Sequence, residues 1–282
     1  MHSRLKAEIF LASITFIWGS TFTVTKSLLH SVSPLLYIGI RFTAASLVFA
    51  LVFRGRLLAL NRGTFLRGAL LGALLFLGLV LQTVGLQFTS ASKSAFLTGM
   101  LVVFTPILQL ALERMPPKRG NLLGIGLVIA GLYFLTSPRG SAFNHGDLLT
   151  LGCAFVFALY IVLLDTFSKN HGAIEMTAAQ FITAGILGII AAATLEQPSF
   201  TASQSSFGSL AYMVLAATVP TIYIQTKYQP MTTPSRSAVI FSLEPVIAAV
   251  IAAVVLGEKL GATGILGGAL IVGGLLASEL ME

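Results

Sequence analysis

The segment IFSLEPVIAAVIAAVVLGEK, from Ile240 to Lys259, places a carboxylate and a proline side by side within an apolar run. A membrane helix should avoid the charge of Glu244, which costs roughly 2.5–3.5 kcal/mol at the bilayer centre. Pro245 also lacks the N–H that would bond the carbonyl of Phe241. The segment therefore predicts a membrane helix that bends or opens at Glu244 and Pro245.

The composition of the whole chain agrees with a membrane location. Hydrophobic residues make up 56% of the 282 residues and charged residues 10%, whereas a soluble domain carries about 25% charged residues. The mean hydropathy is +0.92. The net charge of +7 does not indicate nucleic-acid binding, because the basic residues fall in short loops between apolar runs. Since Cys153 is the single cysteine, an internal disulfide is excluded.

Ten apolar runs match the length of a membrane helix, which needs about 20 residues. They are approximately 7–27, 34–53, 66–86, 93–113, 120–137, 147–166, 174–194, 207–226, 235–256 and 261–280. The alternation typical of a membrane β-barrel is absent, so the spans are predicted to be helices. No small-residue cleavage site follows the first run, so it is predicted to be a retained span rather than a signal peptide.

The basic residues predict an orientation. With the N-terminus inside, twelve of the 17 lysines and arginines fall on the inner side and four on the outer side, while Arg41 lies within a span. Because cytoplasmic loops are enriched in lysine and arginine, we predict that both termini face the cytoplasm. The compartment is predicted to be the inner (plasma) membrane of a prokaryote.

An internal repeat relates the two halves of the chain. SKSAFL (Ser92–Leu97) matches SRSAVI (Ser235–Ile240), and LGIGLVIAG (Leu123–Gly131) matches LGGALIVGG (Leu266–Gly274), both at an offset of 143 residues. Each half, 1–140 and 141–282, would hold five spans, so the second half would enter the membrane from the opposite side. The sequence thus predicts an all-α integral membrane protein of ten transmembrane helices, arranged as two inverted five-helix repeats in one transmembrane domain.

Several motifs together resemble a known family. They are FIWGSTF (Phe16–Phe22), Arg41 with Phe42, GLQFTSASKSAFL (Gly85–Leu97) and, above all, SLEPVIAAVIAAVVLGEKLGATGILGGALIVGG (Ser242–Gly274). The chain resembles the EamA-type, ten-span members of the drug/metabolite transporter superfamily over nearly its whole length. The resemblance implies a carrier of small metabolites, often acting outward. It also implies a central cavity surrounded by spans 1, 3, 4, 6, 8 and 9, with spans 5 and 10 at the periphery.

Glu244 has two interpretations. It is either a site acid that binds a proton, a cation or a substrate amine, or a structural clamp that accepts hydrogen bonds and fixes the bend at Pro245. The first half has no equivalent acid, since Leu101 and Val102 occupy the matching positions, and its proline, Pro106, comes one turn later. Whatever Glu244 does is therefore not duplicated in both halves.

Three basic residues lie at or within span ends. Lys93 and Arg236 occupy matching positions at the starts of spans 4 and 9, where each would either bind an anionic substrate group or extend to lipid headgroups. Arg41 lies deeper in its span, and extension to the interface, pairing with Glu244 and pairing with a helix end all remain open.

Polar and aromatic side chains interrupt the other apolar spans. Trp18, Ser20 and Thr21 form a break in the first span and are predicted either to line the cavity or to pack. Amides in lipid require partners, so the following residues are predicted to face the bundle or the cavity: Gln82, Gln87, Tyr223, Gln225 and Tyr228. The predicted substrate-binding set is thus Trp18, Ser20, Thr21, Gln82, Lys93, Tyr223, Gln225, Arg236 and Glu244.

Small residues in spans 5 and 10 predict close helix packing. Gly120 and Gly124, and likewise Gly264 and Gly268, are spaced four residues apart. This spacing serves either contacts within one chain or a dimer face, so the protein is predicted to be a monomer or a homodimer. Arg41, Pro106, Pro245 and these glycines form the predicted structural set.

Enzyme chemistry finds little support. The four histidines lie at a terminus or in loops, and Asp147 and Asp165 stand at opposite ends of span 6. No P-loop or metallohydrolase motif occurs, so no cofactor, metal or catalytic residue is predicted. The favoured function is a secondary active transporter that exports amino acids or similar small metabolites by alternating access, with a proton as a candidate coupling ion. The alternative is a membrane-embedded enzyme acting on lipid-like substrates.

Overall fold

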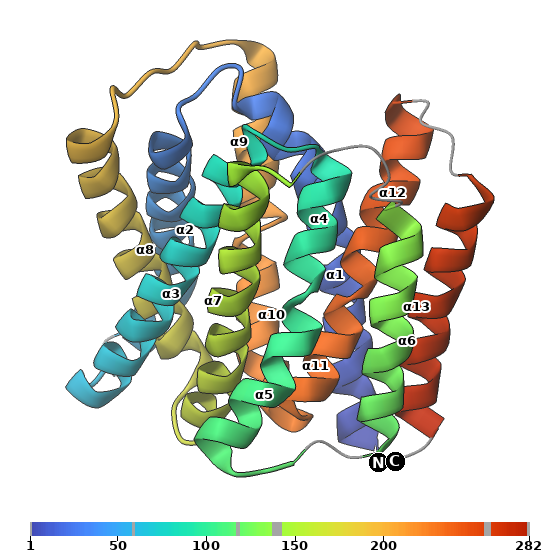
Figure 1. Cartoon of the computed structure of the whole chain (residues 1–282). Coiled ribbons are helices and arrows are strands. Elements are labelled where there is room, and N and C mark those ends of the chain that lie inside the picture. The colour runs from blue at the N-terminus through green and yellow to red at the C-terminus, as the bar shows by residue number, and fades with distance from the viewer. Residues whose placement is uncertain (1, 58–59, 117–118, 137–142, 257–260, 281–282) are drawn as a thin grey trace.

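The computed structural model describes residues 2–57, 60–116, 119–136, 143–256 and 261–280. Over these residues the chain forms a bundle of α-helices joined by short connections, and its β-structure is limited to an isolated bridge between Val32 and Phe200. Both ends of the described chain lie at the same end of the bundle (Figure 1).

The helices follow the predicted runs closely. They are α1 (His2–Leu28), α2 (Pro34–Leu57), α3 (Arg62–Leu86), α4 (Ala91–Gly99), α5 (Leu101–Glu113), α6 (Arg119–Thr136), α7 (His145–Ser168), α8 (Ala173–Leu195), α9 (Gln204–Leu215), α10 (Val219–Tyr228), the short 3-10 helix η1 (Gln229–Met231), α11 (Pro234–Phe241), α12 (Leu243–Leu256) and α13 (Ala262–Leu280).

Eight stretches of the described chain are long and apolar enough to cross a membrane. Three of them are interrupted: one contains α4 and α5, another contains α9, α10 and η1, and the last joins α11 to most of α12. Two shorter apolar stretches, Arg119–Phe134 and Ala262–Ala277, belong to α6 and α13. The chain is therefore a multi-pass, all-helical membrane protein.

The interruption predicted at Glu244 and Pro245 is present. Ser242 separates α11 from α12, so Pro245 lies in the first turn of α12, where its missing N–H is tolerated. In the first half Met100 separates α4 from α5 in the same way, but Pro106 lies inside α5. The two interruptions face each other, since a Cβ added to Gly99 would lie 3.2 Å from Cγ of Pro245.

Helix pairs build the bundle from its two edges inward. In Figure 1, α6 and α13 lie side by side at one edge, and α2 and α8 lie together at the other. Between them, α3 packs against α7 and α8, and α1 packs against α12. The peripheral position of spans 5 and 10, which correspond to α6 and α13, is the one that the family resemblance implied.

The close packing predicted for spans 5 and 10 occurs within one chain. A Cβ added to Gly274 would lie 2.7 Å from the carbonyl oxygen of Gly124, and a Cβ on Gly131 would lie 2.6 Å from that of Gly267. Separations this short exclude any side chain without a shift of backbone, so glycine is required. A Cβ added to Gly268 would lie at an ordinary contact distance of 3.6 Å from Cγ1 of Val246, and Gly120 and Gly264 are buried.

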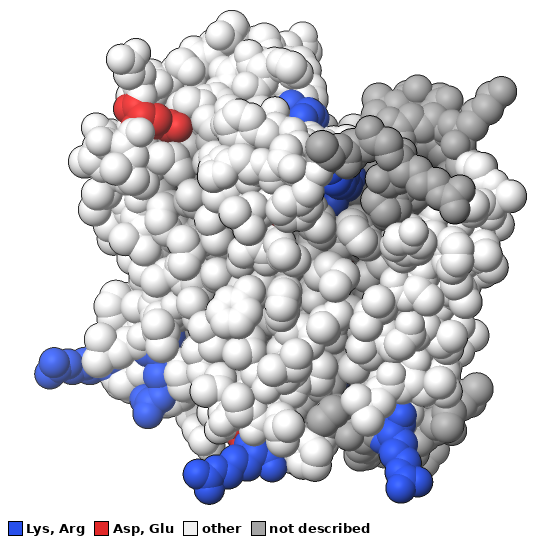
Figure 2. All heavy atoms as spheres, in the orientation of Figure 1, with Lys and Arg blue, Asp and Glu red and all other residues white. Residues whose placement is uncertain are grey.

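The outer surface is that of a protein in lipid. Large apolar side chains point outward on several helices, for example Leu51 at 76% and Val254 at 79% exposure. The space-filling view shows a broad uncharged band, and most of the visible lysine and arginine side chains gather at the end that carries the chain termini (Figure 2). This distribution fits a molecule whose middle is surrounded by hydrocarbon.

Candidate functional site

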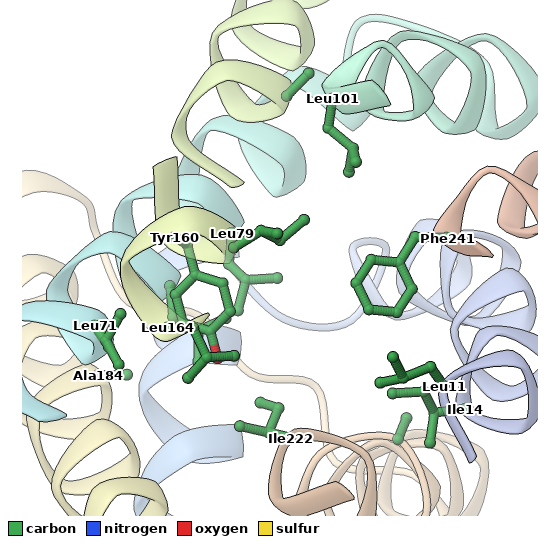
Figure 3. Close-up of a cluster of buried hydrophobic side chains, with 14 of the residues drawn as sticks. Leu11, Ile14, Leu71, Leu79, Leu101, Tyr160, Leu164, Ala184, Ile222 and Phe241 are labelled. Carbon is green, nitrogen blue, oxygen red and sulfur yellow. The ribbon is translucent and has the colours of Figure 1, made fainter. Parts of the chain in front are cut away.

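A cavity of about 90 Å³ lies between helices of both halves of the chain, with room for roughly six to nine water molecules. It is lined by Trp18, Thr21, Phe22, Thr25, Arg41, Leu75, Leu79, Gln82, Thr83, Leu86, Thr98, Leu101, Phe157, Tyr160, Ile161, Ile222, Gln225, Phe241 and Glu244. In the close-up, Leu79, Leu101, Tyr160, Ile222 and Phe241 surround an open space (Figure 3). The lining comes from the six spans implied by the family resemblance, with Arg41 added from α2.

Glu244 enters the cavity from the first turn of α12, directly after the interruption at Ser242. Over the described residues, no group donates a hydrogen bond to its carboxylate and no cation pairs with it. The helix that carries it is held close to α1, since a Cβ added to Gly19 would lie 2.7 Å from Cγ2 of Ile247 and 3.1 Å from the carbonyl oxygen of Glu244. The glycine of the FIWGSTF motif thus sets the position of α12 beside the cavity.

Arg41 is 6% exposed and lines the same cavity from α2. Its Nε donates to Oγ1 of Thr218 (2.6 Å), Nη1 to the hydroxyl of Tyr37 (3.2 Å) and Nη2 to the carbonyl oxygen of Ala217 (3.2 Å). Of the alternatives left open by the sequence, the structure therefore selects the helix end, because Ala217 and Thr218 form the break between α9 and α10. All three acceptors are neutral, and no carboxylate of the described chain pairs with Arg41.

Aromatic and amide groups complete the lining. The rings of Trp18 and Phe241 meet edge to face with centroids 5.5 Å apart. Nε2 of Gln82 donates to Oγ1 of Thr98 (3.1 Å). Nε2 of Gln225 donates to Oε1 of Gln229 (3.0 Å). The amides are thus oriented by neighbouring side chains while still bordering the cavity, together with Thr21.

Four residues of the predicted binding set, Ser20, Lys93, Tyr223 and Arg236, stand outside the cavity lining. The hydroxyl of Ser20 shares a hydrogen bond with that of Tyr212 (2.6 Å). Tyr223 packs against Phe49 and Phe53, with ring centroids 5.9 and 5.6 Å apart. A role for Ser20 and Tyr223 in binding substrate stays a prediction.

Lys93 lies at the start of α4, away from the described cavity lining, beside an acid of the other half. Its Nζ is 2.6 Å from Oδ2 of Asp147, a residue with 0% exposure. Thr89 donates to Oδ1 of Asp147 (2.8 Å), and the backbone N–H of Asn144 donates to Oδ2 (2.8 Å). Asp147 thus binds Lys93 and also completes the N-terminal cap of α7.

Arg236 has a matching arrangement at the other end of the bundle. It is 2% exposed and holds the carboxylate of Glu8 from two nitrogens, with Nη2 3.1 Å from Oε2 and Nε bonded to Oε1. Arg4 donates to Oε1 of Glu8 from one turn earlier in α1 (3.0 Å). Each cation is therefore paired with an acid near the start of the first helix of the opposite half.

The sequence interpretation missed Glu8 and Asp147 as partners. Glu8 follows Arg4 by four residues, which suggests an ordinary pair on a solvated helix face. A signal was nevertheless present: an acid lies near the start of the first span of each half, and Lys93 and Arg236 are related by the repeat. In the structure each of these two cations meets the acid of the other half.

Comparison with known proteins gives concordant matches. A profile of the EamA-like transporter family matches the chain twice, over residues 5–137 and 144–279. An uncharacterized transporter of Archaeoglobus fulgidus is 33% identical over 259 residues, or 91% of this chain and 80% of the relative. An S-adenosylmethionine/S-adenosylhomocysteine transporter of Chlamydia muridarum is 29% identical over 196 residues, or 64% of this chain and 61% of the relative.

The fold is also that of a solved structure. The crystal structure of another protein superposes with a TM-score of 0.83, covering 99% of this chain and 98% of that chain, at 17% sequence identity. At this identity the likeness concerns the arrangement of the helices alone.

Proposed function

Because the chain belongs to the EamA-like transporter family, we propose that it is a secondary active exporter of amino acids or related small metabolites. As a member of that family it is a membrane transporter of the drug/metabolite transporter superfamily, and not an enzyme. The observation that carries the proposal is the cavity between the two halves, which joins an apolar and aromatic lining to Arg41, Glu244 and two amides. Such a lining suits a small polar substrate with few oriented contacts.

Amino-acid-like substrates are favoured by two considerations. The cavity presents one basic and one acidic side chain, Arg41 and Glu244, and its volume of about 90 Å³ suits a small molecule. The chlamydial relative is named for S-adenosylmethionine and S-adenosylhomocysteine, and both compounds contain an α-amino-acid group. The sequence contains no P-loop for ATP hydrolysis, so transport would be driven by concentration gradients of the substrate or of a coupling ion.

Alternating access would use two inverted repeats of five spans, with α6 and α13 as the two shorter spans. Several features support this arrangement. The family profile matches each half separately. The first residues of α4 and α11 are 143 residues apart, and both helices are interrupted after about nine residues. Lys93 of the first half pairs with Asp147 of the second, and Arg236 of the second half pairs with Glu8 of the first, at opposite ends of the bundle. Rocking of one repeat against the other would then expose the cavity to each side in turn.

Counterflow in proteoliposomes tests the function. Vesicles loaded with a millimolar unlabelled amino acid are diluted into a trace of the same labelled compound, using a panel of small neutral, acidic and basic amino acids. We expect transient accumulation of label for at least one compound, because exchange through one cavity requires no external energy. Empty vesicles and vesicles with heat-denatured protein are the controls. Absence of counterflow for the whole panel would reject amino acids as substrates.

Reporter fusions test the proposed orientation in a bacterial inner membrane. A fusion after Arg119 and one at Glu282 are expected to report a cytoplasmic location, because the basic residues favour that side. Fusions after Arg139 and Lys259, which lie outside the described residues, are expected to report the external side. An external signal at Glu282 would contradict both the orientation and the inverted repeat.

A further inference from the structure

Two ionisable side chains, one basic and one acidic, border one cavity without pairing with each other. Arg41 approaches from α2 and Glu244 from α12. No counter-charge for either is present in the part of the chain that the structure describes. Elsewhere in the bundle, buried Arg236 is paired with Glu8, and buried Asp147 with Lys93. An unpaired ionisable residue inside a membrane protein is costly and is usually functional. A bound ligand would explain why these two residues differ from the paired ones.

We propose that this cavity binds a small zwitterion, with the substrate carboxylate on Arg41 and the substrate ammonium on Glu244. The inference rests on the proposed function and assigns the substrate groups to residues. A zwitterion supplies one counter-charge to each side chain and adds no net charge to the bundle. A singly charged ligand would leave one of the two residues uncompensated.

Arg41 is suited to a carboxylate. A guanidinium carries five N–H donors, and three of those of Arg41 are directed to Thr218, Tyr37 and Ala217. These neutral acceptors fix the orientation of the side chain but leave its charge and two donors for a ligand. A carboxylate accepts two such hydrogen bonds in parallel.

Glu244 is suited to an ammonium group. It lies on the cavity next to the aromatic pair of Trp18 and Phe241, and Phe157 borders the same space. A cation beside Glu244 would gain an ion pair and would also be attracted by the ring faces. A volume of about 90 Å³ has room for a ligand of roughly six to nine heavy atoms, on the scale of water-sized positions, as in alanine or serine.

Ligand truncation tests the assignment on the purified, full-length protein in nanodiscs. Calorimetry is performed with L-alanine and L-serine, with the decarboxylated analogues ethylamine and ethanolamine, and with the deaminated analogues propionate and 3-hydroxypropionate. At least one zwitterion is expected to bind, and its two analogues are expected to bind about 10- to 100-fold more weakly. Analogues that bind as tightly as the zwitterion would overturn the proposal.

Variants then assign each charge. Glu244→Gln should lower the affinity for the zwitterion and for the amine about tenfold or more, and should leave the affinity for the acid unchanged. Arg41→Gln should lower the affinity for the zwitterion and for the acid, and should leave the affinity for the amine unchanged. If Arg41→Gln does not fold, Arg41→Lys serves instead, because it keeps a charge but loses the paired donors. The matched controls are Glu175→Gln in α8 and Arg67→Gln in α3, both outside the cavity lining.

The outcomes separate this inference from the proposed function. Equal weakening of all ligands by Glu244→Gln would indicate a structural role and reject the assignment. Failure of both zwitterions to bind, with counterflow of another metabolite intact, would reject the zwitterion site while the transporter function stands. Failure of counterflow for every amino acid would reject the proposed substrate class itself.

Discussion

Replacing Glu8 with alanine is expected to lower the free energy of unfolding by about 3–5 kcal/mol, the usual cost of leaving one member of a buried ion pair without its partner. Arg236 is 2% exposed and Glu8 is 8% exposed, and two guanidinium nitrogens of Arg236 contact the carboxylate. The effect should be measured by equilibrium unfolding in mixed detergent micelles. It is large because total protein stability is commonly about 5–15 kcal/mol.

Two control variants isolate the role of the ion pair. The double variant Glu8→Met with Arg236→Met removes both charges and should recover most of the lost stability, because no buried charge is then left alone. Arg4→Ala removes a partner whose side chain is 37% exposed, so it should change stability by less than about 1 kcal/mol. A Glu8→Ala protein as stable as the unmodified chain would show that the pair contributes nothing.

The elements that determine the fold were predictable because they depend on local sequence. Apolar runs bounded by charged loops located the helices, and the pair Glu244–Pro245 located the interruption between α11 and α12. The break between α9 and α10 was missed, although Pro220 lies within the predicted span 207–226 and stands in the first turn of α10. Pro220 supplies a local cause, because proline lacks the backbone N–H that would continue a helix. Arg41 of a distant helix also bonds Ala217 and Thr218 at the break, and the sequence could not show this contact.

The sequence predicted several residues of the candidate site but not which residues they contact. The cavity lining includes the predicted residues Trp18, Gln82, Gln225 and Glu244. Sequence could not show that Arg236 is engaged by a residue 228 positions away. The two hypotheses for Arg236, binding of a substrate anion and contact with a lipid headgroup, both assumed that no residue of the protein pairs with it. A buried guanidinium in a folded bundle is normally paired within the protein.

Substitution of Glu244 is expected to affect transport and not stability, the opposite of what is expected for Glu8. Replacing Glu244 with glutamine or alanine should reduce counterflow at least about tenfold, because a charge-assisted contact with substrate is lost. The free energy of unfolding should stay equal or rise. The reason is that no group of the described chain donates a hydrogen bond to this carboxyl group. Its removal therefore leaves no donor unsatisfied and takes an unpaired ionisable group out of the bundle.

This expectation separates the two hypotheses for the residue. A clamp that fixes the bend through hydrogen bonds would tolerate glutamine, and alanine would then lower stability by about 1–3 kcal/mol through unsatisfied donors. A site acid would lose transport with either substitution and keep its stability. Counterflow and unfolding should be measured on the same preparations, with Glu175→Gln as the matched control.

Pro245→Ala completes the series. Alanine restores an N–H that can bond the carbonyl of Phe241, so α11 and α12 should approach one continuous helix. Since Glu244 stays in place, ligand affinity should persist while turnover slows.

If Glu244→Ala left both counterflow and stability unchanged, the carboxylate would contribute neither to a substrate site nor to the bend. The cost of placing it within the membrane would then have no physical reason in either hypothesis.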